Sequence, residues 1–271
     1  MAHGRSTRSR HCSPRSQRRR PSIDRRLVIV LTIQRRVHII GCGMPKSGTT
    51  SIARMLGRVL RARHEFEMDE AARVHLLQQR GEMTSEQVDE WLVGRDERCN
   101  AEVDSTSFLW TWVDRLPSVF PDARFVSTVR EPHDWCRSLA GMLLAMGTVS
   151  DDHMVWAEST GAGDVGNRPL DNPLDFLTAG MGYWRQSALA IGSLPPQRTW
   201  WCRTSDLSAR ADDLARWAGV HPDWLRREPA NQAVIPLADV QSALADEWVA
   251  AAVTHEDEAV WRSLGDLADR A

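Results

Sequence analysis

One short segment combines three features that suit phosphate binding. It reads Gly41-Cys-Gly-Met-Pro-Lys-Ser-Gly-Thr-Thr-Ser51, so it holds glycines, a lysine and several hydroxyl side chains. An apolar run, residues 37–40, precedes it, and apolar residues at helical spacing follow it. Glycines in such a strand-to-helix turn let successive backbone N–H groups converge at the helix N-terminus, where the helix dipole also favours an anion. The segment therefore predicts a phosphate-binding loop.

The position of the lysine separates this loop from the one that binds ATP or GTP. The Walker pattern is G-x-x-x-x-G-K-[ST], and placing it on residues 43–50 puts Thr49 where the lysine should be. The lysine is instead Lys46, the single lysine of a chain with 33 arginines. Pro-Lys-Ser-Gly-Thr-Thr after a strand resembles the 5′-phosphosulfate loop of the sulfotransferases that use 3′-phosphoadenosine-5′-phosphosulfate. That resemblance implies that five residues hold the donor's 5′ end: Lys46, Ser47, Gly48, Thr49 and Thr50.

A second segment strengthens the resemblance. In these sulfotransferases an Arg at a strand end and a Ser eight residues later hold the 3′-phosphate of the donor. Here Arg130 follows the predicted strand residues 125–129, Pro132 comes two residues after it, and Ser138 has the matching spacing. A guanidinium fork suits a terminal phosphate, and ATP has no phosphate at the 3′ position. The resemblance thus implies a site that selects this donor over ATP, with Lys46 balancing charge on the leaving phosphate and with no metal required.

The general base is open among several side chains. Small-molecule members of the family carry a catalytic His in a stretch that here reads Asp104-Ser-Thr-Ser107. Other branches use a Glu shortly after the phosphate-loop helix, and here Glu65 and Glu67 occupy that stretch. A partly desolvated carboxylate near an anionic donor can have its pKa raised enough to act as a base. We rank Glu67 and Glu65 nearly equal, then Asp104, then His64.

Elements alternate in a way that predicts the fold class. From residue 37, β-rich runs alternate with helical patterns, which indicates an α/β fold in three layers: a central parallel β-sheet with a P-loop-like strand-loop-helix and helices on both faces. The expected strands are 37–40, 100–104, 124–129 and 198–203. The expected helical regions are 48–63, 69–94 with Thr84 and Gln87 at capping-box spacing, 132–146, 206–218, 237–253 and 256–269. Most of the twelve Trp are expected in the core.

The two signs of charge are unevenly distributed. Residues 1–36 hold eleven Arg and one acidic residue, whereas the remainder holds 23 basic and 35 acidic residues. We expect a basic, disordered arm at 1–36 and a sulfotransferase domain at 37–271, in which 147–173, rich in Gly, Asp, Asn and Pro, forms a lid that shapes the acceptor pocket. An acidic domain argues against nucleic-acid binding.

The amino-acid composition also bears on the cellular compartment of the protein. No run of residues approaches the roughly 18 apolar residues of a membrane-spanning helix, and the five cysteines show no metal-ligand spacing. We expect a reduced, cytoplasmic protein with no membrane partner.

Together these features predict a sulfotransferase that moves a sulfuryl group from 3′-phosphoadenosine-5′-phosphosulfate to a hydroxyl or amine of a small molecule or glycan, leaving 3′,5′-adenosine bisphosphate. Two alternatives stay open. One is a P-loop nucleotide-dependent kinase, which the displaced lysine disfavours, and the other is an inactive nucleotide-binding module, which the missing His allows. The acceptor cannot be read from the sequence, and the oligomeric state is open, with a homodimer among the options.

Overall fold

The computed structural model describes residues 34–146, 172–225 and 239–270. Apart from Gln34, these residues belong to one compact unit, Arg35–Ala271. The expected lid at 147–173 lies outside the described residues except for its last two. The expected arm lies outside them except for Gln34, Arg35 and Arg36.

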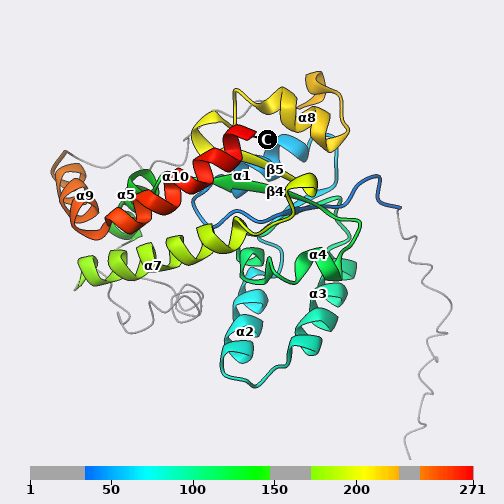
Figure 1. The fold of residues 1–271 in the computed structure, drawn as a ribbon, viewed down its shortest axis with the longest axis horizontal. Helices are drawn as coiled ribbons and strands as arrows, with labels where there is room; N and C mark the ends of the chain where they lie inside the picture. The colour runs from blue at the N-terminus through cyan, green and yellow to red at the C-terminus, as the bar shows by residue number, and fades with distance from the viewer. Residues whose placement is uncertain (1–33, 147–171, 226–238, 271) are drawn as a thin grey trace, which may run out of the picture. The chain divides into compact units, whose positions relative to one another are not determined.

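A five-stranded parallel sheet forms the centre of this unit, which confirms the predicted α/β class (Figure 1). Its strands are β1 (Ile39–Gly41), β2 (Ala62–His64), β3 (Val103–Ser105), β4 (Arg124–Val129) and β5 (Thr199–Arg203). They lie in the order β2-β3-β1-β4-β5, so the chain first fills one side of β1 and then crosses to the other. Parallel strands bring all their carboxyl ends to one edge, and ligands of such sheets bind where the strand order reverses. The carboxyl end of β1 is that place.

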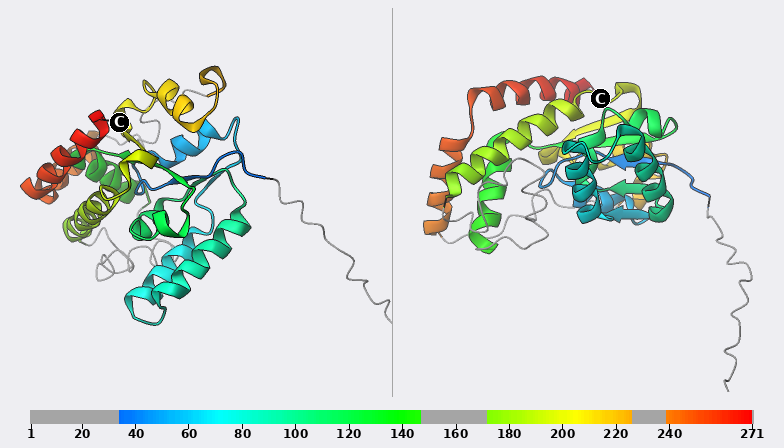
Figure 2. Two further views of the ribbon diagram at one scale, coloured as in Figure 1. Left: turned by 45° about the vertical axis from the view of Figure 1, so that its right-hand side comes forward. Right: turned by 90° about the horizontal axis from the view of Figure 1, so that it is seen from below.

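Helices cover both faces of the sheet, and apolar clusters fix which helix lies on which face. On one face lie α1 (Thr49–Leu56) and α8 (Ala211–Ala218). On the other lie α2 (Met68–Gln79), α3 (Ser85–Cys99), α4 (Leu116–Val119), α5 (Pro132–Met146), α7 (Pro173–Ile191), α9 (Asp239–Ala252) and α10 (His255–Arg270). Figure 2 shows α5, α7, α9 and α10 gathered in one group, separate from α2 and α3. Short 3₁₀ helices connect the elements at Ser107–Trp112, Pro196–Arg198, Thr204–Asp206 and Pro222–Trp224.

Strand side chains alternate between the two cores. Ile40, Phe125 and Trp201 join the larger cluster, whereas their neighbours Ile39 and Val126 join the smaller one. This alternation follows from the two-residue period of a strand. The two buried faces make the unit a three-layer structure.

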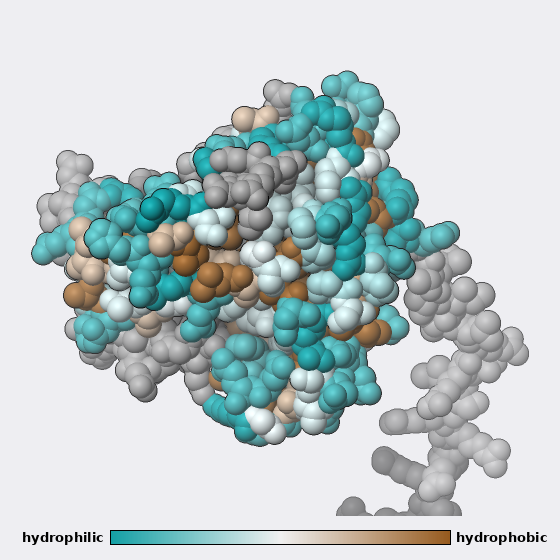
Figure 3. Space-filling view, in the orientation of Figure 1, coloured by the Kyte–Doolittle hydropathy of each residue, from teal (hydrophilic) through white to brown (hydrophobic). Residues whose placement is uncertain are grey.

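Most described tryptophans are in the core, as the sequence predicts. Trp112, Trp135 and Trp184 are among the largest fully buried side chains, whereas Trp224 is 59% exposed. On the face drawn in Figure 3, apolar surface appears between polar side chains along α7, where Leu189 is exposed. No helix in the described ranges is both long enough and apolar enough to span a membrane.

The structure corrects one sequence-based element assignment and refines another. The single helix expected at 48–63 ends at Leu56, and its second half contains the strand β2 instead. The helical region expected at 69–94 consists of two helices, of which α3 has the predicted capping box at Thr84 and Gln87. The predicted strand 124–129 and helix 132–146 are confirmed at both ends.

Candidate functional site

The loop between β1 and α1 is built around two left-handed residues. Lys46 has φ 66° and Gly48 has φ 105°, and the second of these favours glycine because other side chains rarely adopt it. A side chain at Gly43 would bring its Cβ within 2.8 Å of the Ser47 and Thr128 hydroxyls, so the loop also needs glycine there for space. The loop is therefore curled against the end of β4.

Three buried or half-buried donors hold three consecutive loop carbonyls. The Trp135 indole on α5 donates to the carbonyl of Pro45 at 2.7 Å, and Arg130 donates to that of Lys46 at 3.2 Å. The Thr204 hydroxyl, directly after β5, donates to the carbonyl of Ser47 at 2.6 Å. Because side chains from other parts of the fold donate to these carbonyls, contacts within the protein stabilise the loop conformation.

The N-terminus of α1 has no side-chain cap. Its N-cap residue is Gly48, which has no side chain to accept a hydrogen bond from the first turn. The first N–H groups of a helix have no intrahelical partner, so they stay available to an anion, and the helix dipole adds to the attraction. The hydroxyls of Thr49 and Thr50 belong to the same turn. This end of α1 has the chemistry of a phosphate site.

Two cations, Lys46 and Arg130, lie at this helix end, and neither forms a close ion pair with any carboxylate in the part of the chain that the structure describes. Burial and the positive charge of Arg130 both lower the pKa of Lys46, and burial lowers the pKa of Arg130. The Nε of Arg130 is buried with no hydrogen-bond partner, and none of the ion pairs formed within the described ranges includes either residue. Asp134 and Glu131 only partly offset the burial of Arg130. An anion bound here would favour the charged form of both groups, so the residues fit a phosphate-bearing ligand.

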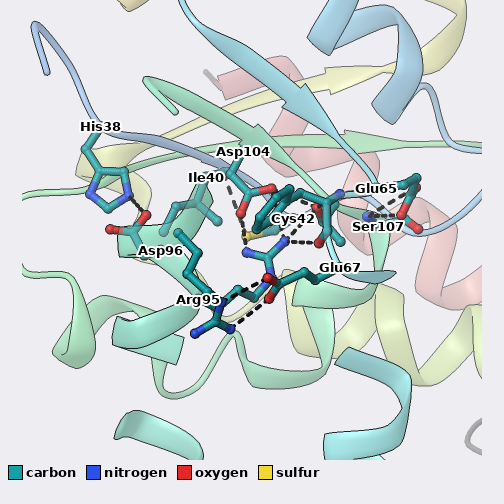
Figure 4. Close-up of polar contacts among 12 residues, drawn as sticks. His38, Ile40, Cys42, Glu65, Glu67, Arg95, Asp96, Asp104 and Ser107 are labelled. Carbon is teal, nitrogen blue, oxygen red and sulfur yellow. Dashed lines mark hydrogen bonds and ion pairs between the residues drawn. The ribbon is translucent and has the colours of Figure 1, made fainter. Parts of the chain in front are cut away.

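Glu65 lies at the same edge of the sheet, just after β2. Burial raises the pKa of its carboxyl, and hydrogen bonds from Ser107 partly offset this effect. The Ser107 N–H donates to the carboxylate at 3.3 Å (Figure 4), and His64 Nε2 lies 3.3 Å from Oε1 of Glu65. The same His64 nitrogen is 3.1 Å from the Thr50 hydroxyl. Glu65 is thus linked through His64 to the first turn of α1.

Glu67 has a different environment from Glu65, although only one residue separates them. Its carboxylate forms a two-pronged ion pair with Arg98 of α3, at 2.8 and 2.9 Å, and these hydrogen bonds lower its pKa. Figure 4 shows the two glutamates directed to different neighbours. Phe66 between them is held at both backbone groups, since its N–H donates to Thr106 and its carbonyl accepts from Arg95.

Asp104 is part of a buried ion pair rather than an open site. Its carboxylate contacts Arg95, and the two residues are 4% and 2% exposed. The Thr106 hydroxyl donates to the same carboxylate at 2.7 Å. Because Arg95 and Thr106 also hold Phe66, this pair orders the segment that carries Glu65 and Glu67.

Two further predicted site residues, Ser47 and Ser138, have different surroundings. Ser47 is buried, and its hydroxyl donates to the carbonyl of Met44 at 2.7 Å. Ser138 is half-buried on α5, and no polar contact joins it to Arg130 among the described residues, so its role stays a prediction. Within those residues no group of three or more His, Cys, Asp or Glu side chains is arranged to hold a metal ion.

Sequence reasoning missed the side chains that hold the loop. Trp135 and Trp184 resemble ordinary core residues, yet each also donates to a carbonyl of the site, Trp184 to that of Arg130 at 3.1 Å. Thr204 had one available signal, since it directly follows a predicted strand whose carboxyl end reaches this edge. No local pattern marks the two tryptophans.

Comparison with known proteins agrees with the class that the fold and loop define. Residues 38–165 match the family described as "Sulfotransferase domain". This part of the chain, which includes the phosphate loop and Arg130, therefore matches a sulfotransferase domain, in agreement with the resemblance seen in the sequence. No curated protein sequence matches the chain.

Three solved structures show a distant similarity to the chain. A sulfotransferase from Alicyclobacillus acidocaldarius has a TM-score of 0.49 at 15% identity, over 84% of this chain and 95% of that one. The sulfotransferase domain from the curacin biosynthetic pathway has a TM-score of 0.47 at 15% identity, over 84% and 97%. The sulfotransferase domain from the Synechococcus PCC 7002 olefin synthase has a TM-score of 0.40 at 13% identity, over 79% and 94%.

Proposed function

We propose that this protein is an enzyme that transfers a sulfuryl group from 3′-phosphoadenosine-5′-phosphosulfate to a hydroxyl or amine of a small molecule or glycan. The observation that carries the proposal is the pair Lys46 and Arg130. Both are half-buried, neither has a carboxylate partner within the described residues, and both adjoin the uncapped end of α1. Such a pair is costly unless an anion completes it.

The donor would be held by groups from two loops. Lys46, Ser47, Gly48, Thr49 and Thr50 would bind its 5′ end, and Arg130 with Ser138 would bind its 3′-phosphate. The bound donor supplies an activated sulfuryl group and a phosphate as leaving group. Lys46 and the N–H groups of α1 would stabilise negative charge on that phosphate, which is the kind of preorganised electrostatic contribution that dominates such transfers.

Glu65 is our candidate for the general base. A base must be unprotonated to act yet have enough affinity for the proton, and a pKa raised by burial provides that affinity. Glu67 is held by Arg98 and has a lowered pKa, and Asp104 is neutralised by Arg95. Between the two glutamates that the sequence ranks nearly equal, these contacts favour Glu65.

We also propose that the protein acts in the cytoplasm as a reduced protein. Four cysteines in the described ranges are free and buried, and burial raises the pKa of their thiols. The acceptor class, small molecule or carbohydrate, remains part of the proposal, as does the absence of nucleic-acid partners.

Calorimetry with 3′,5′-adenosine bisphosphate tests the donor site. We expect metal-independent binding that weakens at least about tenfold for adenosine 5′-phosphate, because Arg130 then loses its phosphate partner. Arg130→Ala should remove this preference. Arg58→Ala, at an exposed position next to α1, is the matched control and should retain it. Magnesium-dependent binding of ATP instead would favour a kinase and contradict the proposal.

Three variants test the choice of base once transfer to an acceptor is detected. Glu65→Gln should lower kcat at least about 100-fold, the low end for a general base, without weakening donor binding. Glu67→Gln should stay within a few-fold of the wild type. Asp104→Asn should mainly lower the free energy of unfolding, because it leaves Arg95 buried without its partner. A larger loss in kcat for Glu67→Gln than for Glu65→Gln would contradict the assignment.

A further inference from the structure

One ring nitrogen of His64 faces three oxygens at the carboxyl edge of the sheet. Its Nε2 is 3.1 Å from the Thr50 hydroxyl, 3.3 Å from the Thr49 hydroxyl and 3.3 Å from Oε1 of Glu65. The side chains of His64 and Glu65 are 30% and 24% exposed, so both are partly buried and both reach solvent. His64 thus offers the Glu65 carboxyl a neighbouring group through which a proton can reach water.

That nitrogen cannot satisfy all three oxygens at once. In a neutral imidazole, Nε2 carries either one hydrogen or one lone pair. With a hydrogen, it donates to the ionised carboxylate of Glu65. With a lone pair, it accepts from the hydroxyl of Thr50 or Thr49, or from a protonated Glu65. The distances from Nε2 to these oxygens allow either arrangement, as a group that passes a proton requires.

The charges around the two side chains bring their proton affinities closer together. Burial lowers the pKa of His64, Arg54 of α1 lowers it further, and Asp104 of β3 opposes this. Burial raises the pKa of Glu65, Asp104 adds to the rise, and Arg95 of α3 opposes it together with the bonds from Ser107. From ordinary values of 6.5 and 4.5, the two pKa values therefore move toward each other.

We propose that His64 is a positioning and relay residue that carries the acceptor's proton from Glu65 to solvent. This inference rests on the proposed function. As the acceptor oxygen bonds to sulfur, the bond from sulfur to the 5′-phosphate oxygen breaks and 3′,5′-adenosine bisphosphate leaves with that electron pair. The acceptor O–H bond breaks at the same stage, and its proton joins a carboxylate oxygen of Glu65. That new O–H bond then breaks as Nε2 of His64 takes the proton and the ring becomes an imidazolium. The imidazolium releases one proton to water or buffer, so one proton in total moves from acceptor to solvent and Glu65 returns to its ionised form.

The relay predicts a chemical rescue that a purely structural role does not. His64→Ala should lower kcat about tenfold or more, with little change in the donor KM, and added imidazole should restore part of the loss. Arg63→Ala, an exposed neighbour on the same strand, is the control and should show neither loss nor dependence on imidazole. Glu65→Gln should not respond to imidazole either, because the proton acceptor itself is gone. A His64→Ala enzyme with normal kcat, or with a loss that imidazole leaves unchanged, would overturn the relay.

A second experiment tests the relay without measuring enzyme turnover. NMR titration of the His64 ring in the wild type and in Glu65→Gln reports whether the two groups share a proton equilibrium. Loss of the neighbouring negative charge should move the His64 titration to lower pH, whereas Arg63→Ala should leave it near the wild-type value. An unchanged His64 titration in Glu65→Gln would overturn the coupling. Failure of wild-type donor binding and turnover, with the titration shift present, would instead count against the proposed function alone.

Discussion

The proposed site depends on Lys46, a residue type that occurs nowhere else in the chain. Arginine fills 33 of the 34 Lys and Arg positions, yet lysine is at the tip of the phosphate loop. A compact ammonium can approach one oxygen without the planar space that a guanidinium needs. The structure adds that Lys46 has φ 66°, a conformation that is strained for a residue with a side chain. Strain held at this position is consistent with a functional rather than a structural choice of residue.

Replacing Lys46 by glycine should separate stability from activity. Lys46→Gly relieves the left-handed strain, so we expect the free energy of unfolding in urea to rise by about 1 kcal/mol. The loss of the ammonium should at the same time lower kcat/KM by at least about 100-fold. Asn100→Gly, at a left-handed residue that ends α3, is the control and should leave activity unchanged. A Lys46→Gly enzyme with near-normal kcat/KM would disprove the role of the ammonium.

The two glutamates show what sequence spacing can and cannot predict about a site. The loop, Lys46 and Arg130 were recognisable because their neighbours along the chain form the pattern. Glu65 and Glu67 share almost the same neighbours, and what distinguishes them is Arg98, 31 residues away from Glu67. Their side chains turn to different partners because Thr106 and Arg95 hold the backbone of Phe66 between them. Such contacts exist only once the strands have paired.

At the scale of elements, the predictable strands were the buried apolar ones. β4 has three apolar residues among six, is buried along almost its whole length, and was predicted at both ends. β2 consists of Ala, Arg and His and is partly exposed at the sheet edge, and the apolar residues before it, Val59 and Leu60, continue the helical spacing of α1. Only Gly57 signalled the break. A polar edge strand of three residues has too little apolar character to show in a sequence.

β3 was predicted too early for a related reason. It ends in Asp104 and Ser105, which are buried although their side chains are polar. Arg95 neutralises the carboxylate, and the Ser105 hydroxyl donates to the carbonyl of Thr49 at 2.9 Å. Polar residues continue a buried strand when partners from other elements satisfy them. Those partners lie on α3 and α1, outside any local sequence window.

The element junction at Thr204 gives the next prediction. Its single hydroxyl hydrogen is shared between the carbonyls of Ser47 and Val129, at 2.6 and 3.0 Å, and so joins the phosphate loop to the carboxyl ends of β4 and β5. Thr204→Val should lower the free energy of unfolding by about 1–3 kcal/mol, because buried carbonyls lose their donor, and should also weaken binding of 3′,5′-adenosine bisphosphate.

Thr199 provides a matched control for this prediction. It begins the same strand, is also buried, and its hydroxyl donates to the carbonyl of Pro195 at 2.8 Å, at the opposite edge of the sheet. Thr199→Val should therefore lower the stability to a similar degree while the affinity for the bisphosphate, measured by calorimetry, stays at the wild-type value. Equal losses of affinity in both variants would show that general destabilisation, not the loop contact, explains the effect of Thr204→Val.

At the scale of the whole molecule, the compact unit begins before the boundary expected from charge. Arg35 and Arg36 count toward the basic segment 1–36, yet Arg35 pairs with Asp96 at 2.6 Å and Arg36 with Glu102 at 2.8 Å. Glu102 is fully buried, and its second partner is Arg61. A charge count weighs all arginines alike, so it does not show that the last two hold buried or half-buried carboxylates.

Truncating the chain tests this boundary, and the pH dependence of the stability loss tests whether Glu102 is its source. A chain that begins at Arg35 should keep the wild-type free energy of unfolding in urea at pH 7, whereas one that begins at Val37 should lose about 1–3 kcal/mol, because Glu102 loses its bonds from Arg36. The hydrogen bond from Arg36 lowers the pKa of Glu102 from 4.5 to about 2. A carboxyl whose pKa is lowered by folding stabilises the folded state at pH values above its unfolded-state pKa. It loses that effect as pH falls through its folded-state pKa. The difference in the free energy of unfolding between the two chains should therefore be full above pH 4.5 and shrink as pH falls toward 2. Arg36→Gln in the full chain should show the same pH dependence, and a difference that is constant from pH 7 to pH 3 would rule out Glu102 as its source.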